Sequence, residues 1–284
     1  MEISIICPTY NKLQYLKLFT KSIKDNSSYN HELIFHINDG SDGSLNYIKE
    51  NNLKFTHTKD NIGLCSSVNK AFLKSTKKYI LYAHDDMYFC KNWDRFLEQE
   101  VNKYDDNLFY LSGTNVSHKD GLINYDCGTS YNNFDKEKFD KFCEVDVSKN
   151  LQGSHWAPHL FHRDLWINVN GFSEEFNPGD GSDPDLCCKL WFLENVRIFK
   201  CLSKFKVYHF GSVTIRKKKI KKNNGTKLFL LKWGFNPKFF RKYYLRGEKN
   251  LEFNGPLQKP IFSLSMLFDL IINKLKFFYY KILK

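Results

Sequence analysis

Short apolar runs alternate with segments of helical periodicity through the first 103 residues of the chain. An uninterrupted run such as residues 79–83 is typical of a strand that is buried on both faces. Between the runs, apolar side chains recur every three or four residues, which predicts amphipathic helices. The expected strands are 3–7, 31–38, 54–58 and 79–83, and the expected helices are 13–24, 45–50, 64–76 and 92–103. This alternation predicts an α/β fold with a mostly parallel central sheet and helices on both faces.

The pattern weakens in the second half of the chain. Residues 113–154 carry alternating charges, which predicts irregular structure or short edge strands. Loop 178–181 is rich in glycine and is expected to be mobile. The strands expected here are 157–162 and 206–209, and the expected helices are 163–169 and 183–194. We therefore expect one domain over 1–215, made of two halves that meet near residue 112.

The character of the sequence changes after residue 215. A basic run at 216–222 precedes a predicted helix at 226–233. From 261 to 284, apolar side chains occupy one half of a helix, and lysines, Asp269 and Asn273 occupy the other. This pattern is typical of an anchor on an anionic membrane, but it also fits a helix that packs on the domain or on a second copy. Residues 216–284 are expected to form a basic linker and an amphipathic helical extension.

Composition limits the class of protein. The chain has 284 residues with 42% hydrophobic and 17% aromatic side chains, so a large core is expected. The net charge of +12 suits a nucleotide, a nucleic acid or an anionic membrane as partner, or reflects a lysine-rich background. Aromatic residues do not interleave with the basic run, which argues against nucleic acid. Eight cysteines without a CxxC pair, no leader segment and no membrane-spanning run predict a cytoplasmic protein, with peripheral contact to the inner face of a membrane as an option.

Carboxylates follow predicted strands and open a predicted helix. Asp39 and the pair Asp85 and Asp86 come directly after strands, and ligands of such sheets bind beyond the strand ends. Hard oxygen ligands suit Mg²⁺ or Mn²⁺. Asp183 and Asp185 open a helix, where acids cap the helix or face a cleft as a general base. A simple turn is the alternative for Asp39, and capping is the alternative for the others.

Two further segments carry aromatic and imidazole groups. His209 ends the last predicted strand and is either a ligand or a structural histidine. Trp156, with His155 and His159, lies near Gly153 and either lines an acceptor pocket or packs as an aromatic cluster.

Taken in order, these segments resemble the motifs of the inverting family 2 glycosyltransferases of the GT-A fold. The resemblance runs from Ile3 to about Ser212. The matching segments are Pro8-Thr9-Tyr10-Asn11, Asn38-Asp39-Gly40-Ser41, Asp60-Asn61-Ile62-Gly63 followed by Asn69, His84-Asp85-Asp86, Gly171-Phe172-Ser173-Glu174-Glu175-Phe176, Ser182-Asp183-Pro184-Asp185-Leu186 and Val207-Tyr208-His209-Phe210-Gly211-Ser212.

The resemblance implies a role for each residue. Half 1–112 would bind the nucleotide sugar and half 113–215 the acceptor. Asp86 and His209 would hold Mn²⁺ or Mg²⁺, and Asp183 would be the general base. Trp156 and Asp185 would contact the acceptor. The expected contacts of the nucleotide sugar are Pro8, Thr9, Tyr10, Asn11, Asp39, Asn61, Gly63, Asn69 and Asp85.

The chain departs from the family pattern at two acids. His84 replaces the first acid of the DxD motif, and Ser182 replaces the usual Glu before the base. No Gln-x-x-Arg-Trp motif and no membrane helices follow, which argues against processive polymer synthesis. We expect inverting, metal-dependent transfer from a nucleotide-diphospho-sugar, with a UDP-sugar as the expected donor, to a glycan or lipid-linked saccharide in polysaccharide biosynthesis. A homodimer stays open. The alternative is a non-catalytic module that binds a nucleotide sugar or a carbohydrate.

Overall fold

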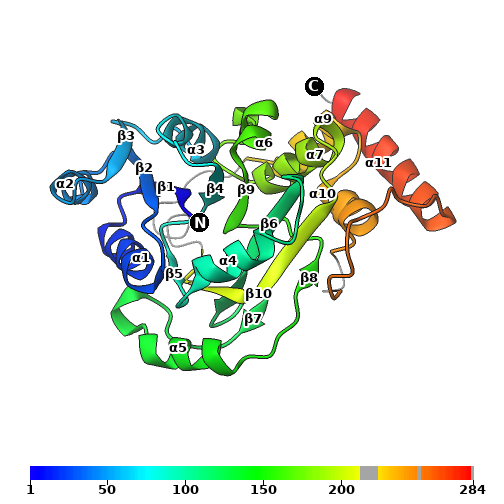
Figure 1. The fold of residues 1–284 in the computed structure, drawn as a ribbon. Coiled ribbons are helices and arrows are strands. Elements are labelled where there is room, and N and C mark those ends of the chain that lie inside the picture. Colours follow the sequence, from blue (N-terminus) through cyan, green and yellow to red (C-terminus); the bar gives the residue numbers. More distant parts are fainter. Residues whose placement is uncertain (212–222, 248–250, 283–284) are drawn as a thin grey trace.

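The computed structural model describes residues 1–211, 223–247 and 251–282. Within these ranges, ten strands form one sheet with the order β3-β2-β1-β4-β9-β6-β10-β5, and β7 and β8 pair at its side with β6 and β10 (Figure 1). The strands are β1 (Ile3–Tyr10), β2 (Glu32–Asn38), β3 (Lys54–Thr58), β4 (Tyr79–Tyr82), β5 (Met87–Phe89), β6 (Phe109–Ser117), β7 (Ile123–Asn124), β8 (Leu151–Gln152), β9 (His159–His162) and β10 (Ile198–His209).

Helices pack against this sheet, as the apolar periodicity predicts. α1 buries Tyr15, Leu16, Phe19 and Ile23, which lie on one side of the helix. The helical elements are α1 (Leu13–Asn26), α2 (Ser44–Glu50), α3 (Leu64–Phe72), α4 (Trp93–Val101), η1 (Tyr131–Asn133), α5 (Lys136–Val145), α6 (Arg163–Asn168), η2 (Glu174–Phe176), α7 (Ser182–Leu193), α9 (Gly225–Trp233), α10 (Pro237–Phe239), η3 (Phe240–Leu245) and α11 (Leu264–Ile282). The α/β class predicted from the sequence is confirmed.

The direction of the strands brings four strand ends to one edge of the sheet. β3, β2, β1 and β4 are parallel, as predicted. β9 is antiparallel to both β4 and β6, and β10 is parallel to β6. Two antiparallel steps restore the direction, so β10 runs the same way as β1 and β4. The carboxyl ends of β1, β2, β4 and β10 therefore lie at the same edge, where ligands of α/β sheets bind.

The second half of the sheet differs from the expectation because polar residues are buried there. Residues 113–154 were expected to form irregular structure or short edge strands, and β7 and β8 are such short strands. β6, however, is a central strand that extends to Ser117 and buries Ser112 and Thr114. β10 begins eight residues earlier than predicted and buries Lys200 and Lys206. Lys200 is paired with Glu100, and Lys206 lies 3.1 Å from a carboxylate oxygen of Asp146. These pairs offset the cost of burying a charge, but they break the apolar pattern that marks a strand.

The segment after β10 folds back onto the domain. α9 packs against η2, and α11 packs against α9 at the outer side of the molecule, drawn in red in Figure 1. α9 and α11 occupy the regions predicted to be helical, whereas α10 and η3 were not expected. The basic run 216–222 lies outside the described residues. In the described part of the chain, no helix is both long and apolar enough to cross a bilayer.

Candidate active site

A pocket of about 220 Å³ opens at the edge where the strand ends meet. β1, β4 and β10 each contribute side chains to it, from their last residues or from the turns that follow. It brings together eight of the residues that the sequence singled out, namely Pro8, Thr9, Tyr10, Asn61, Gly63, Asp85, Asp86 and His209. It also contains Lys12 and His84, which were not assigned a role in binding.

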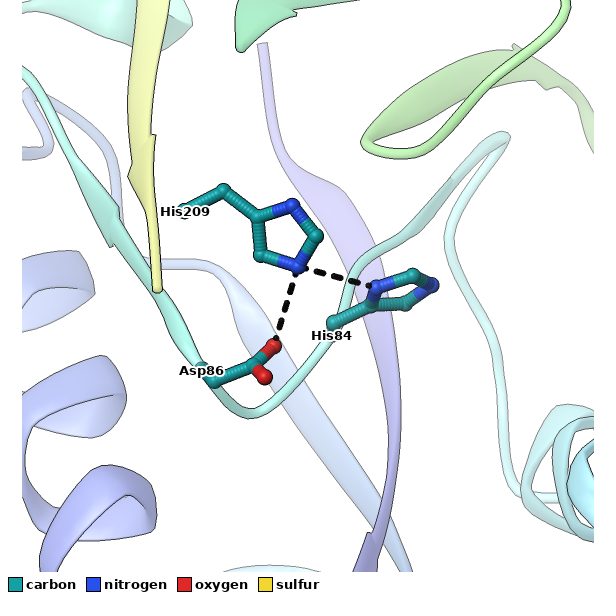
Figure 2. A group of neighbouring side chains, drawn as sticks. All are labelled: His84, Asp86 and His209. Atoms are coloured by element: carbon teal, nitrogen blue, oxygen red, sulfur yellow. Dashed lines mark hydrogen bonds and ion pairs between the residues drawn. The ribbon is translucent and has the colours of Figure 1, made fainter. Parts of the chain in front are cut away.

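Three of these residues form a candidate metal centre, shown in Figure 2. His209 Nε2 lies 3.2 Å from Asp86 Oδ1 and 3.5 Å from His84 Nδ1. One ligand atom from each residue lies within 4.8 Å of the others. Pairing of β5 with β10 places Met87 opposite His209, which brings Asp86 beside this histidine. The three side chains can converge on one cation.

The chemistry of these donors fits a divalent transition metal. Burial, with a contribution from neighbouring His209, lowers the pKa of His84 to about 3, so this imidazole is neutral and keeps a lone pair for a metal. Two imidazole nitrogens and a carboxylate suit a divalent transition-metal ion, whereas Mg²⁺ prefers oxygen ligands. The His that replaces the first acid of the DxD motif thus offers a ligand atom.

Among the described residues that line the pocket, Lys12 is the one lysine, and the sequence did not predict its role. Its Nζ lies 2.8 Å from Asp85 Oδ1 and 3.2 Å from Asp86 Oδ2. Thr9 donates a hydrogen bond to the other Asp85 oxygen at 2.6 Å. Burial lowers the pKa of Lys12, but the Asp85 and Asp86 carboxylates outweigh burial and raise the pKa above its ordinary value. Its position directly after Asn11, at the start of α1, was the available signal.

Asn11 and Asp39 join the ends of the neighbouring strands β1 and β2. Both have left-handed backbones, with φ of 49° and 63°, as Asn and Asp often do in tight turns. The Asn11 amide donates to Asp39 Oδ2 at 2.7 Å, and its carbonyl accepts from the Gly40 N–H at 2.8 Å. Asp39 also accepts from the Ser41 N–H. This arrangement fixes the Asp39 carboxylate beside the pocket.

Asn61 and Gly63 of the Asn-x-Gly segment line the pocket, whereas Asn69 does not. Asn61 accepts a hydrogen bond from the Gly63 N–H, and a Cβ at Gly63 would come within 2.4 Å of Asn177, so this close approach requires glycine. Asn69, in contrast, is engaged elsewhere. Its amide donates to the Phe172 carbonyl at 2.8 Å and accepts from the Phe172 N–H at 2.9 Å. Asn69 therefore holds α3 to residues 171–174, and this placement speaks against its expected contact with the nucleotide sugar.

Asp183, the expected general base, has lost contact with water on one side of its carboxylate. Its Oδ1 is buried and has no hydrogen-bond partner among the described residues. Burial raises the pKa of Asp183 to about 7, because the charged carboxylate has lost water without gaining a donor. Burial raises the pKa of the Tyr82 hydroxyl, and the negative charge of the nearby Asp183 raises this pKa further. Tyr82 packs edge-on against His84 at 5.4 Å between ring centres, so it links the base to the metal cluster.

Asp185 has the opposite surroundings. It is fully buried, and Oδ1 accepts from Trp233 Nε1 at 2.8 Å and lies 2.9 Å from Lys232 Nζ. Oδ2 accepts from Ser173 Oγ at 2.6 Å. These partners occupy both oxygens, so the expected role of Asp185 in acceptor contact does not fit its position. Asp185 instead ties α7 to the end of α9.

The loop before the base is held at its ends, contrary to the mobility expected for residues 178–181. The side-chain oxygen Oδ1 of Asn177 accepts from the Cys65 N–H at 3.0 Å. Asp180 Oδ2 accepts from the Gly225 N–H at 3.1 Å, and the Asn223 amide donates to the Asp180 carbonyl at 2.9 Å. The start of α9 therefore holds the loop 178–181 in place, and the end of α9 holds α7 in place. Asp183 lies between these two attachments.

Trp156 lines a second cavity of about 560 Å³ that adjoins the first, because His209 borders both. Its indole N–H donates to the Gly113 carbonyl at 3.0 Å, which fixes the ring. Of the neighbouring histidines, His159 is fully buried and lies 2.7 Å from the Tyr110 hydroxyl. His159 is therefore a core residue and does not line this cavity.

Comparison with solved structures identifies the fold of this chain. Solved structures similar to this one include glycosyltransferases of the GT-A fold. They include S. aureus TarS residues 1–349, with a TM-score of 0.54 and 15% identity over 74% of this chain and 60% of that one. GalNAc-T7, solved with UDP, GalNAc and Mn²⁺, gives a TM-score of 0.57 and 11% identity over 81% of this chain and 47% of that one. At these identities the likeness shows the fold.

The family follows from the sequence match. The model of the family described as "Glycosyl transferase family 2" matches residues 4–165, so the chain belongs to this family. An uncharacterized glycosyltransferase from Rickettsia bellii is 29% identical over 124 residues, which are 42% of this chain and 17% of that protein. The chain thus spans only a small part of that relative and less than two thirds of the TarS fragment.

Proposed function

We propose that this protein transfers a sugar from a nucleotide-diphospho-sugar to an acceptor hydroxyl, with inversion at the anomeric carbon and with a bound divalent metal. The observation that carries the proposal is the combination of two groups at one edge of the sheet. His84, Asp86 and His209 form a cluster of metal ligands. Asp183 offers a buried carboxylate oxygen without a hydrogen-bond partner among the described residues and a pKa raised to about 7.

The donor would lie in the pocket of the strand ends. Asp39 would accept hydrogen bonds from the base or the ribose, and Thr9 and Lys12 hold Asp85 in place beside the diphosphate. His84, Asp86 and His209 would hold Mn²⁺, or less favourably Mg²⁺, which when bound stabilises the negative charge of the leaving diphosphate. Solved complexes of TarS with UDP-GlcNAc and of GalNAc-T7 with UDP support a UDP-sugar as donor.

The chemical step would use Asp183. Its Oδ1 accepts the proton of the acceptor hydroxyl, and the hydroxyl oxygen forms a bond to the anomeric carbon. The bond from this carbon to the diphosphate oxygen breaks, and the nucleoside diphosphate leaves. A positioned base typically accelerates such a step by about 10² to 10⁴. A pKa near 7 leaves a large share of Asp183 deprotonated at neutral pH while it remains basic enough to take the proton.

The acceptor would be a saccharide or a lipid-linked saccharide, used without processive elongation. The cavity beside Trp156 has room for it, and an indole ring suits the apolar face of a sugar. We place the protein in the cytoplasm, where its eight cysteines stay reduced; all eight are free thiols in the structure.

A screen of UDP-sugars with Mn²⁺ tests this proposal. We expect one donor to raise the melting temperature in the presence of Mn²⁺, and UDP to be released when an acceptor is added. The alternative, a module that binds nucleotide sugars without catalysis, predicts the thermal shift but no release of UDP with any acceptor. No shift with any UDP-sugar would contradict both.

A further inference from the structure

The C-terminal helix α11 packs on the protein through the side that carries Asn273, Asp269 and the buried Met266. Asn273 is 3% exposed, and its Oδ1 accepts from the Asn236 N–H at 2.9 Å. Asp269 Oδ2 accepts from Lys242 Nζ at 2.8 Å and from the Tyr243 hydroxyl at 2.7 Å. A surface helix of a globular protein ordinarily turns its apolar side to the core. In α11, polar groups share the packed side with Met266, and most of the large apolar side chains lie on the other side.

The apolar side of α11 consequently faces outward. At 100° per residue, eight of its apolar side chains share a stripe about 120° wide on the side away from Asn273. All of them are between 39% and 84% exposed, and we call this set the apolar stripe: Leu264, Leu267, Phe268, Ile271, Leu275, Phe278, Tyr279 and Ile282. Ile261 and Phe262 continue it before the helix begins, with 87% and 64% exposure. A contiguous apolar surface of this kind marks an interaction site.

Lysines border the apolar stripe on both sides. Lys276 follows one margin, and Lys274 and Lys281 follow the other, at the angles that 100° per residue assigns. All three are exposed. The chain as a whole carries a net charge of +12. An exposed apolar stripe with lysines at both margins matches a surface of acyl chains beneath anionic headgroups.

We propose that α11 docks this protein on a membrane that contains anionic lipids. The apolar stripe inserts at the boundary of headgroups and acyl chains, and the lysines meet the lipid phosphates. The helix lies in the plane of the interface, since it is not apolar enough to cross a bilayer. A second copy of the chain fits less well, because face-to-face pairing of two stripes would bring their bordering lysines together.

The position of α11 relates this surface to the candidate base. α11 packs on α9, and α9 holds Asp185 through Lys232 and Trp233. Docking would thus keep α7 at a fixed distance from the lipid surface. This consequence suits an acceptor carried by a lipid, but the docking itself is independent of the proposed transfer activity.

Flotation of the full chain with vesicles tests the proposal. The vesicles contain phosphatidylcholine with phosphatidylglycerol, or phosphatidylcholine alone. The stripe variant combines Ile271→Ser, Leu275→Ser and Phe278→Ser. The matched control replaces three apolar residues that are exposed elsewhere, at 77%, 92% and 51%, namely Leu73→Ser, Val147→Ser and Ile167→Ser. Because all six side chains face solvent, both variants should fold, and their melting temperatures check this.

We expect wild type and the control to float with the anionic vesicles, and the stripe variant to lose at least about tenfold of its bound fraction. The variant Lys274→Gln, Lys276→Gln and Lys281→Gln should bind anionic vesicles less, and its binding should depend less on salt. Flotation of the stripe variant like wild type would overturn the proposal and place the contact elsewhere. A wild-type protein that does not float but forms a dimer, which the stripe variant dissociates, would assign the surface to a second copy instead.

Discussion

Asp183 and Asp185 lie two residues apart at the start of α7 and have opposite surroundings. Asp185 accepts hydrogen bonds from Ser173 and Trp233 and forms an ion pair with Lys232. Asp183 Oδ1 is buried without a partner among the described residues. The neighbouring carboxylate thus holds the helix in place and leaves the other one available for proton transfer. This division of roles yields the first prediction.

Loss of the Lys232 ion pair should disturb the base without touching the donor. We expect Lys232→Met to lower the free energy of unfolding by about 1–3 kcal/mol, because a buried carboxylate loses a charged partner. The maximal rate should fall while the affinity for the donor stays within about twofold, since Lys232 is outside the donor pocket. Lys227→Met on the same helix is the control and should leave the rate unchanged. Equal loss of donor affinity and rate would show that α9 supports the whole site and not α7.

The raised pKa of Asp183 predicts how stability depends on pH. Burial lifts this pKa from 3.8 to about 7, so between these values the folded state holds a proton that the unfolded state releases. Stability therefore falls as the pH rises through this window. Asp183→Asn removes the effect, and its melting temperature should exceed that of wild type by about 2 °C or more above about pH 8. Below about pH 4 the two proteins should melt alike. Parallel melting curves across the whole range would contradict a buried, uncompensated carboxylate.

The rate of sugar transfer should also depend on the ionisation of Asp183, but it should rise with pH where the stability falls. Because the base must be deprotonated, the rate with saturating substrates should be half-maximal near pH 7 and reach a plateau above about pH 8. The measurement is a pH profile of UDP release with constant Mn²⁺. A rate that is flat between about pH 5 and 8 would assign the proton to another group.

Removal of a ligand should weaken metal binding. We expect His84→Ala, Asp86→Asn and His209→Ala each to lower the affinity for Mn²⁺ by at least about tenfold, measured by calorimetry or by the resonance of the free ion. Asp164→Asn is the control, because this carboxylate is 73% exposed and outside the pocket. An unchanged affinity for Mn²⁺ in His84→Ala would show that Asp86 and His209 hold the metal without His84.

Lys12 should compete with the metal for the two carboxylates. It lies 2.8 Å from Asp85 and 3.2 Å from Asp86, so its charge opposes that of an incoming cation. Lys12→Met should raise the affinity for Mn²⁺ without nucleotide and lower the affinity for UDP, since a positive charge near the diphosphate is lost. Calorimetric titrations measure both changes. A fall in both affinities would instead show that Lys12 mainly maintains the shape of the pocket.

The sequence predicted the N-terminal half of the fold because its strands are uninterrupted apolar runs. β3 matches its expected range, and β2 and β4 differ from theirs by one residue. The sequence did not predict β6 and the first part of β10, because Ser112 and Lys200 are buried polar residues whose partners lie far away in the chain. Periodicity reports burial against apolar neighbours, and it cannot report a buried ion pair.

The candidate site was partly predictable for a related reason. Residues at strand ends, such as Asp86 and His209, could be placed at one edge from the topology alone. The part played by His84 depends on the side-by-side pairing of β5 and β10, which the sequence did not reveal. Asp185 and Asn69 resemble family motifs, but their hydrogen bonds to Trp233 and Phe172 direct them elsewhere.

Asp183→Asn tests the central claim most directly. The measurement pairs UDP release in the presence of Mn²⁺ and acceptor with calorimetric affinity for the same donor. We predict that the variant releases UDP at least about 10² times more slowly than wild type, while donor affinity stays within about twofold and Asp164→Asn behaves like wild type. UDP release at a rate near that of wild type would contradict the assignment of Asp183 as the base.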